Sequence, residues 1–215
     1  EANAEITVLA GHAVTETIVV DKSVTINLAG NELTAENILP VIRVIGNATV
    51  TVTGDGKITN NNYIFILGAS DGASEGNLVI ENGTFHGATT VASVTMGELT
   101  INGGYFSVDP YTGDGYANYN FLLNCIDKNY KEGNAKIFVK GGSFENYNPE
   151  DNAAETVGTS FVADGYEATT SNGSVWNVVP YGVVAENANT GKQFKTVSAA
   201  LAAAQSGDTV KLLTD

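Results

Sequence analysis

The sequence predicts an all-β fold, a right-handed parallel β-helix, which is a solenoid of short stacked rungs, with one short helix near the C-terminus. The composition is rich in Gly, Asn, Thr and Val and poor in Lys, Arg and Met, which favours strands and turns over helices. A short strand-and-turn pattern recurs five times along the chain. The copies follow one another at steps of 25, 27, 21 and 38 residues, close to the repeat length of a solenoid.

Each copy of the pattern contains an alternating apolar strand, a pair of turn residues, one variable residue and a large apolar residue. The copies occupy residues 24–33, 49–58, 77–85, 98–106 and 136–144. Their turn pairs are Gly30-Asn31, Asp55-Gly56, Asn82-Gly83, Gly103-Gly104 and Gly141-Gly142. Only Gly, Asn and Asp occupy these positions, and these residues tolerate a positive φ. The pattern therefore predicts a left-handed corner at the same place in every copy.

The apolar residues around each turn pair predict one buried face, because side chains alternate between the two sides of a strand. The residues that stand two positions before the pair are Leu28, Ile80, Ile101 and Val139. The residues that stand four positions before it are Ile26, Leu78, Leu99 and Ile137. The copy at Asp55 fits after one inserted residue, Gly54, which is interpreted as a bulge. An internal ladder of like residues is expected after the pair, formed by Leu33, Ile58, Phe85, Phe106 and Phe144.

Further apolar strands fall between the copies, so each period holds at least two strands. They lie at 41–45, 63–67, 90–96 and 121–126. An alternative is a sandwich of hairpins, in which the Asn-Gly and Gly-Gly pairs are ordinary tight turns. Strand lengths and the long steps between copies favour the solenoid.

Several of these segments are similar to a known family. The opening ITVLAGHAVTETIVVDKSVTINLAGNELTA resembles the first rungs of pectate-lyase-like β-helix proteins, and LTINGGYF and IFVKGGSF resemble their later rungs. The resemblance covers residues 5–180, and residues 141–180 resemble the closing element of such modules in surface and phage proteins of gut bacteria. It implies the fold but no single activity, since this fold hosts polysaccharide lyases and hydrolases, adhesins and phage fibres.

The pattern of the sequence changes after Pro180. We therefore divide the chain into a β-helix domain at 1–184 and a C-terminal unit at 185–215. Thr196 is expected to cap a helix over 197–206, with apolar residues at i, i+3, i+4 and i+7 and Gly207 at its end. The strand that follows, 208–213, resembles 4–9. Two interpretations stay open: the unit caps this domain, or it is the truncated start of a second β-helix module.

The step of 38 residues contains a polar, glycine-rich segment at 107–119, which predicts a protruding loop. Loops on a rigid scaffold commonly carry recognition, and tyrosine beside Asp and Asn suits sugar rings, which need an apolar face and hydrogen bonds. The alternative is a surface excursion without a ligand. The predicted ligand-binding residues are Asp109, Tyr111, Asp114, Tyr116 and Tyr119.

No catalytic residue is predicted, and the chain is not expected to be an enzyme. Arg43, the single arginine, has no neighbouring acidic cluster of the kind a pectate lyase uses and is expected to face outward. A glycoside hydrolase needs two paired carboxylates. Acidic residues are present, but without the hydrolase motifs of the family they are interpreted as solvating charges. They include Asp55, Asp71, Glu75, Glu81 and Asp127.

No metal or other cofactor is expected. His12 and His86 are isolated in sequence, and no spacing of Cys, His and acidic residues resembles a zinc site. Asp109 and Asp114 lack the alternating acids of an EF-hand loop, so they indicate calcium only weakly. Cys125 lies in an apolar run and is expected to be buried and inert.

The net charge of −14 opposes binding to nucleic acid or to an anionic membrane. No stretch has the 18 apolar residues of a membrane helix, and residues 1–10 lack the features of a signal peptide. The absence of predicted catalytic residues and the resemblance together lead us to expect a non-enzymatic structural or adhesive module outside a bacterial cell or on a phage virion. A glycan or host-surface polysaccharide, tandem modules and a homo-oligomer are the expected partners. The alternative is a polysaccharide lyase or hydrolase.

Overall fold

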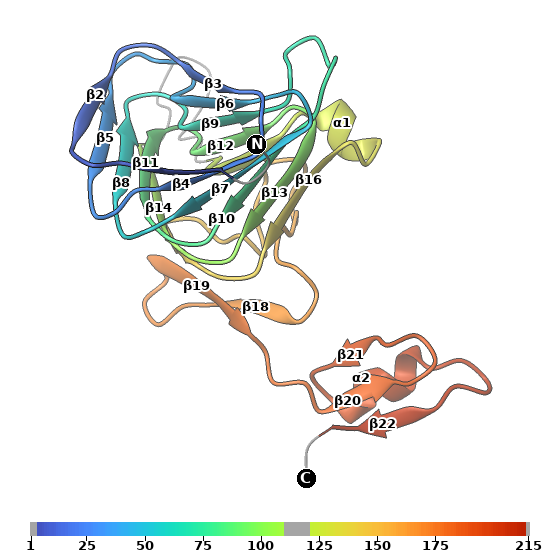
Figure 1. Cartoon of the computed structure of the whole chain (residues 1–215). Coiled ribbons are helices and arrows are strands. Elements are labelled where there is room, and N and C mark those ends of the chain that lie inside the picture. Colours follow the sequence, from blue (N-terminus) through green and yellow to red (C-terminus); the bar gives the residue numbers. More distant parts are fainter. Residues whose placement is uncertain (1–3, 110–120, 214–215) are drawn as a thin grey trace.

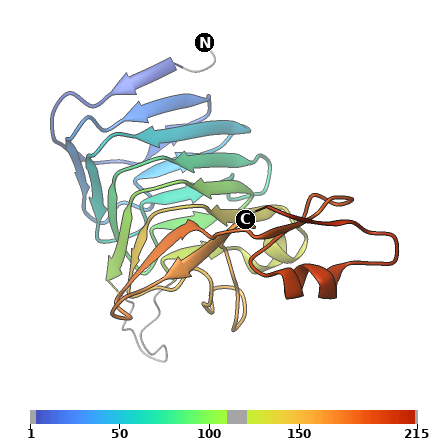
Figure 2. The ribbon, with the colours of Figure 1, turned by 90° about the horizontal axis from the view of Figure 1, so that it is seen from below.

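The computed structural model describes residues 4–109 and 121–213, and it confirms an all-β protein built mainly from parallel sheets (Figure 1). Strands make up 45% of the described residues and helices 6%. Each of the first fourteen strands pairs with the strand three places later, so the chain visits three sheets in turn. The strands are therefore layered from the N-terminal end toward the C-terminal unit (Figure 2).

The first sheet contains β1 (Ala4–Thr7), β4 (Val24–Asn27), β7 (Ala48–Thr53), β10 (Gly76–Ile80), β13 (Gly97–Ile101) and β16 (Ala135–Val139). The second contains β2 (His12–Val14), β5 (Glu32–Ala35), β8 (Lys57–Asn60), β11 (Thr84–Ala88), β14 (Tyr105–Asp109) and β17 (Ser143–Glu145). The third contains β3 (Ile18–Val20), β6 (Ile42–Val44), β9 (Phe65–Leu67), β12 (Ala92–Val94) and β15 (Leu123–Cys125). The strands predicted within and between the five copies are all present.

The predicted ladder of large apolar residues is confirmed. Strand register places Leu33, Ile58, Phe85, Phe106 and Phe144 side by side across the second sheet, and all five are buried. The ring centroids of Phe85 and Phe106 are 5.2 Å apart, and those of Phe106 and Phe144 are 5.0 Å apart, in stacked geometry. One core thus runs through all the layers.

The predicted left-handed corner occurs at the second turn residue in the three later copies. Gly83, Gly104 and Gly142 have φ values of 120°, 105° and 97°. In the first two copies the positive φ comes earlier, at Gly30 and Gly54, with φ values of 77° and 85°. The prediction of one shared position was therefore wrong for those two copies.

Corner length explains this difference. Register aligns Ile26 with Val52 and Val52 with Ile80, whereas the sequence pattern had placed Leu28 level with Ile80. The first corner is two residues longer than the third corner. The second corner is one residue longer than the third. The extra residues carry the left-handed conformation, and Gly54 is such an insertion.

The structure differs from the sequence-based predictions at two further places. Residues 107–109 do not begin a loop, because they complete strand β14 and pair with β11. A short helix, α1 (Asp127–Lys131), follows β15 and was not predicted. Its five residues are too few to show an apolar period in the sequence.

The parallel order ends after β17, which pairs in antiparallel fashion with β19 (Val175–Pro180). Strand β18 (Tyr166–Thr169) pairs with the other edge of β19, again antiparallel. Trp176 stands opposite Phe144, at the end of the phenylalanine ladder. This hairpin covers the last layer of the second sheet.

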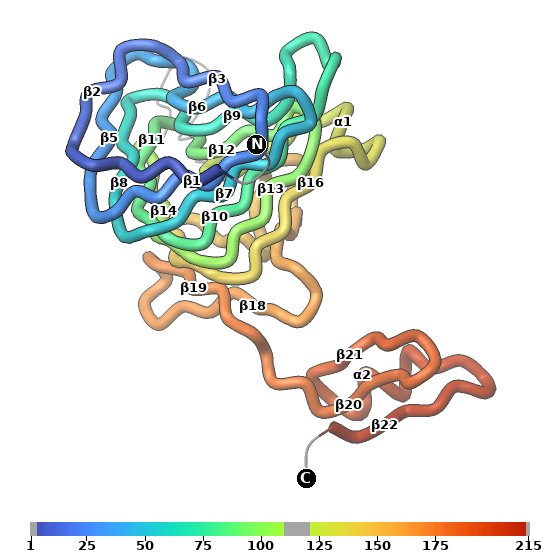
Figure 3. The backbone as a smooth tube through the Cα atoms, in the orientation of Figure 1, coloured from blue at the N-terminus to red at the C-terminus, as the bar shows by residue number. Residues whose placement is uncertain are grey.

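The C-terminal unit contains β20 (Ala185–Asn187), β21 (Gln193–Phe194), α2 (Val197–Ala203) and β22 (Val210–Leu212), as the tube in Figure 3 traces. The side chain of Thr196 caps α2 by accepting a hydrogen bond from the backbone N–H of Ala199 at 3.1 Å, as predicted. The helix ends at Ala203, earlier than predicted, because Ala204 is extended with ψ 141°. The unit has a small core of its own, formed by Ala185, Phe194 and Ala200.

Candidate functional site

A polar groove of about 680 Å³ lies on the outer face of the third sheet and is the candidate site. Its floor follows one register row of side chains, in which Arg43, Ile66, Ser93 and Asn124 stand on neighbouring strands. These residues point outward because their strand neighbours, such as Ile42 and Val44, are fully buried. The other lining residues are Tyr63, Ser70, Asp71, Gly72, Thr95, Met96, Ile126, Lys128, Asn129, Glu132 and Asn134.

Arg43 faces outward, as predicted, and lies half-buried in this groove. Its Nη1 contacts the backbone oxygen of Gly68 at 3.4 Å and Oγ of Ser70 at 3.3 Å, both long for hydrogen bonds. Within the described ranges, no carboxylate lies within ion-pair distance of its guanidinium. A guanidinium has five N–H donors, so most of them remain for the oxygens of a ligand.

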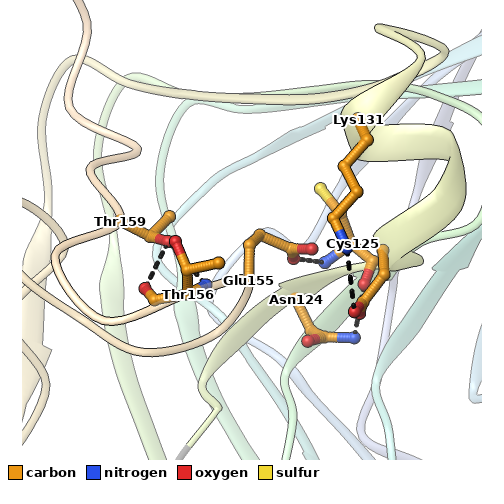
Figure 4. A network of polar contacts seen from close by, with 7 residues as sticks. Asn124, Cys125, Lys131, Glu155, Thr156 and Thr159 are labelled. Atoms are coloured by element: carbon orange, nitrogen blue, oxygen red, sulfur yellow. Dashed lines mark hydrogen bonds and ion pairs between the residues drawn. The ribbon is translucent and has the colours of Figure 1, made fainter.

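Asn124, at the far end of the row, belongs to a network of polar contacts (Figure 4). Its Nδ2 donates to the backbone oxygen of Cys125 at 2.9 Å. The backbone N–H of Cys125 in turn donates to Oε1 of Glu155 at 2.8 Å. Two hydrogen bonds between Thr156 and Thr159 close the loop that carries Glu155. Oγ1 of Thr159 donates to the backbone oxygen of Thr156 at 2.7 Å and accepts from the backbone N–H of Thr156 at 3.0 Å. The network fixes the end of β15 against a loop that comes 30 residues later.

Burial shifts the pKa values of the acidic groups in this network. It raises the pKa of Glu155, an effect that outweighs the hydrogen bond from Cys125. The second carboxylate oxygen of Glu155 is buried and has no hydrogen-bond partner. Burial also raises the pKa of the Cys125 thiol, which is 1% exposed, as predicted from its apolar run. These groups support the strand end and do not open into the groove.

His86, although isolated in sequence, has side-chain partners in space. Its Nδ1 lies 2.9 Å from Oγ of Ser107, and its Nε2 lies 3.4 Å from Oδ2 of Asp109. Histidine and serine face each other across β11 and β14 in register. The side chain of Asp109 is 75% exposed, so water weakens its hold on the imidazole. We assign the cluster to cross-strand pairing at the foot of the predicted loop.

Of the predicted ligand-binding residues, Asp109 ends β14 and is exposed. Tyr111, Asp114, Tyr116 and Tyr119 lie outside the described residues. The groove was not predicted, although its floor consists of the outward positions of strands that were predicted. Aligning those four strands by their buried residues would have placed Arg43, Ile66, Ser93 and Asn124 in one row.

Four of the five acidic residues considered for hydrolysis lie outside the groove. Asp55 accepts a hydrogen bond from Asn82 at 2.6 Å, and Glu81 accepts one from Asn102 at 3.0 Å. These are polar ladders along the corners of successive layers. Asp127 and Lys131 form an ion pair of 3.8 Å on α1. The backbone N–H of Glu75 donates to the side chain of Asn47. Asp71 lines the groove.

In the part of the chain that the structure describes, no group of three or more His, Cys, Asp or Glu side chains is arranged to hold a metal. Neither helix in that part is long and apolar enough to span a membrane. No protein-family model matches the chain, and no match was found among the curated proteins or the solved structures compared with it.

Proposed function

We propose that this chain is a right-handed parallel β-helix that serves as a non-enzymatic structural or adhesive module outside a bacterial cell or on a phage virion. The pairing of each of the first fourteen strands with the strand three places later supports the β-helix, since a chain that visits three parallel sheets in turn builds a continuous stack. The in-register core makes that stack a rigid platform. Its outer faces and loops are then available to recognise a surface.

The groove over the third sheet is the observation that carries the adhesive part of the proposal. It offers a guanidinium, amides and hydroxyls beside the apolar faces of Tyr63 and Ile66. Sugar rings need this combination of hydrogen-bonding groups and apolar contact. Because Arg43 has free donors, we propose a glycan that carries carboxylates, bound along the row from Arg43 to Asn124 and, at the predicted loop, by Tyr111, Tyr116 and Tyr119.

A glycan array, followed by calorimetry on the strongest binder, tests this function. We expect Arg43→Gln and Asn124→Ala each to weaken binding by about tenfold or more, the loss that follows removal of a hydrogen bond to a charged group. Lys57→Gln, which removes one positive charge from the second sheet, is the matched control and should bind normally. Absence of binding to every surface polysaccharide would leave the structural role and remove the adhesive one.

A second candidate function is a polysaccharide lyase or hydrolase, favoured by the presence of Arg43 and Asp71 in one groove. Incubation with uronic-acid and neutral polysaccharides, assayed for unsaturated products and for new reducing ends, separates the two functions. Turnover that disappears in both Arg43→Gln and Asp71→Asn would replace the adhesive proposal. We expect binding without turnover.

A further inference from the structure

A second groove, of about 590 Å³, lies along β16, the last described strand of the first sheet. Helix α1 packs beside β16 (Figure 1) and contributes to the walls of both grooves, but among the described residues none lines both. The lining of the second groove comes from residues 98–164, in the interior of the chain. It includes the outward side chains Lys136, Phe138 and Lys140.

The two lysines of this groove have no internal partner for their charges. Lys136 stands in register with Glu98, but Oε1 of Glu98 accepts a hydrogen bond from Thr100 at 3.3 Å. Asp164 is the other carboxylate of the lining. Within the described ranges, no carboxylate lies within ion-pair distance of Lys136 or Lys140. Their ammonium groups are therefore available to an acidic ligand, which the rest of a chain of net charge −14 repels.

Phe138 lies between the two lysines and gives the groove an apolar floor. It continues an outward row in which Val79 and Thr100 precede it, so a large aromatic ring follows two smaller side chains. The ring is half-buried, which leaves part of it to contact a ligand. The lysines stand two positions to either side of it, about 13 Å apart along the strand. The groove thus fits a ligand with an apolar face between two acid groups.

The edge of β16 is closed to a peptide that would add a strand. The N–H of Val139 donates to the backbone oxygen of Phe161 at 2.8 Å. Alternation turns the backbone groups of Ala135 and Ile137 toward the same edge, and these residues are only 1% and 6% exposed. Tyr130 packs edge-on against Phe161, with ring centroids 6.2 Å apart. The groove therefore offers side chains and not backbone groups, which suits a glycan better than an extended peptide.

We propose that this groove binds an acidic oligosaccharide, with Lys136 and Lys140 holding two acid groups and Phe138 packed against a sugar ring. Carboxylate and sulfate groups both satisfy this chemistry, because both offer charged acceptor oxygens to an ammonium group. The site is separate from the groove at Arg43 and does not depend on the function proposed for that groove.

Lysine acetylation followed by mass spectrometry locates the ligand on the unmodified chain. The probes are a tetramer of uronic acid, a sulfated tetrasaccharide, an uncharged tetrasaccharide and hexaglutamate. We expect at least one of the two acidic sugars to protect Lys136 and Lys140 from acetylation, and the sugar that protects them identifies the acid group. Lys57, on the second sheet, should be acetylated at the same rate with and without each probe. The uncharged tetrasaccharide should protect none of these lysines.

Calorimetry with the protecting probe then measures each contribution, in an Arg43→Gln background that weakens the other groove. Lys136→Gln and Lys140→Gln should each weaken binding by about tenfold, the loss that follows removal of a hydrogen bond to a charged group. Phe138→Ala should also weaken binding, because the sugar ring loses its apolar contact. Lys57→Gln is the matched control and should bind normally. Melting curves verify that each variant is folded.

Three results would overturn the proposal. The first is acetylation of Lys136 and Lys140 that no acidic sugar slows. The second is equal protection by the uncharged tetrasaccharide, which would show that charge does not direct binding. The third is protection by hexaglutamate alone, which would identify an acidic peptide as the ligand. Protection that persists in Arg43→Gln supports a site of its own, and protection that disappears there contradicts it.

Discussion

At the residue scale, the glycine pairs at the corners answer two different requirements. The second glycine of Gly103-Gly104 and Gly141-Gly142 adopts a positive φ, as the sequence predicts. The first does not. It is glycine because a Cβ at Gly141 would collide with the backbone oxygen of Asn102, and one at Gly103 would collide with that of Glu81. Composition indicates that a glycine is needed, but only the stacked layers show which constraint applies.

Alanine substitution separates crowding from backbone strain. Gly141→Ala should destabilise the chain by ~3 kcal/mol, because backbone atoms of the layer below must move. Gly158 has φ 84° and open space where a Cβ would stand, so Gly158→Ala should cost only ~1 kcal/mol of strain. Urea unfolding monitored by circular dichroism measures both. Equal losses would mean that the layers separate easily at this corner.

Glu155 gives a pH-dependent prediction. Its raised pKa means that the folded state holds the proton more tightly than the unfolded state, so stability is lost as pH rises above the ordinary value of 4.5 and through the raised pKa. Glu155→Gln removes the buried charge and keeps an acceptor for the N–H of Cys125. We expect the variant to melt above the unmodified chain at pH 7, with the gap closing toward pH 4.5. A gap that widens on acidification would contradict this sign, and Glu132→Gln, on the exposed surface, is the control.

At the scale of elements, the sequence predicted the strands well and their register less well. Alternation identifies which side chains point inward, so the Leu33 to Phe144 ladder could be read directly. Corner length is invisible to that pattern, because Ile26 and Leu28 are both apolar and both buried. Only pairing with β7 shows that Ile26 is level with Ile80. Helix α1 was not predicted, because its five residues are too few to show the apolar period of a helix.

The phenylalanine ladder should dominate the stability of the stack. Phe106 is fully buried between Phe85 and Phe144, so Phe106→Ala removes two ring contacts and leaves a cavity. We expect a loss of ~3–5 kcal/mol in the free energy of unfolding. Phe138→Ala, at an outward and half-buried position of β16, is the aromatic control and should cost much less. Similar losses for both would show that the inner ladder is no better packed than the outer face.

At the scale of the whole molecule, the groove could not be predicted, because its walls come from segments that are distant in sequence. Asp71 follows β9, Lys128 lies on α1, and Arg43 stands on β6. Each is an ordinary polar residue in its own segment. Stacking brings them to one face, and the network that joins Asn124 to Glu155 depends on a loop that returns after another layer.

The described residues form two separate apolar clusters, and this allows the two interpretations of the C-terminal unit to be tested. The small core of Ala185, Phe194 and Ala200 is separate from the main one. Lys195 bridges the two parts, through an ion pair of 2.7 Å with Glu167 and a position 4.4 Å from the ring centroid of Tyr181. Both contacts lie at the surface, where an ion pair contributes ~0–1 kcal/mol.

A chain ending at residue 184 should therefore melt within ~2–4 °C of the full chain, the shift that ~1 kcal/mol produces in a domain of this size. Calorimetry measures it, and Lys195→Ala, which removes the bridging contacts alone, should reproduce most of the shift. Such a result favours the interpretation of residues 185–215 as the start of a second module, because a cap would protect the end of the stack. A drop several times larger, with exposure of the Phe144 end to a hydrophobic dye, would instead identify the unit as the cap of this domain.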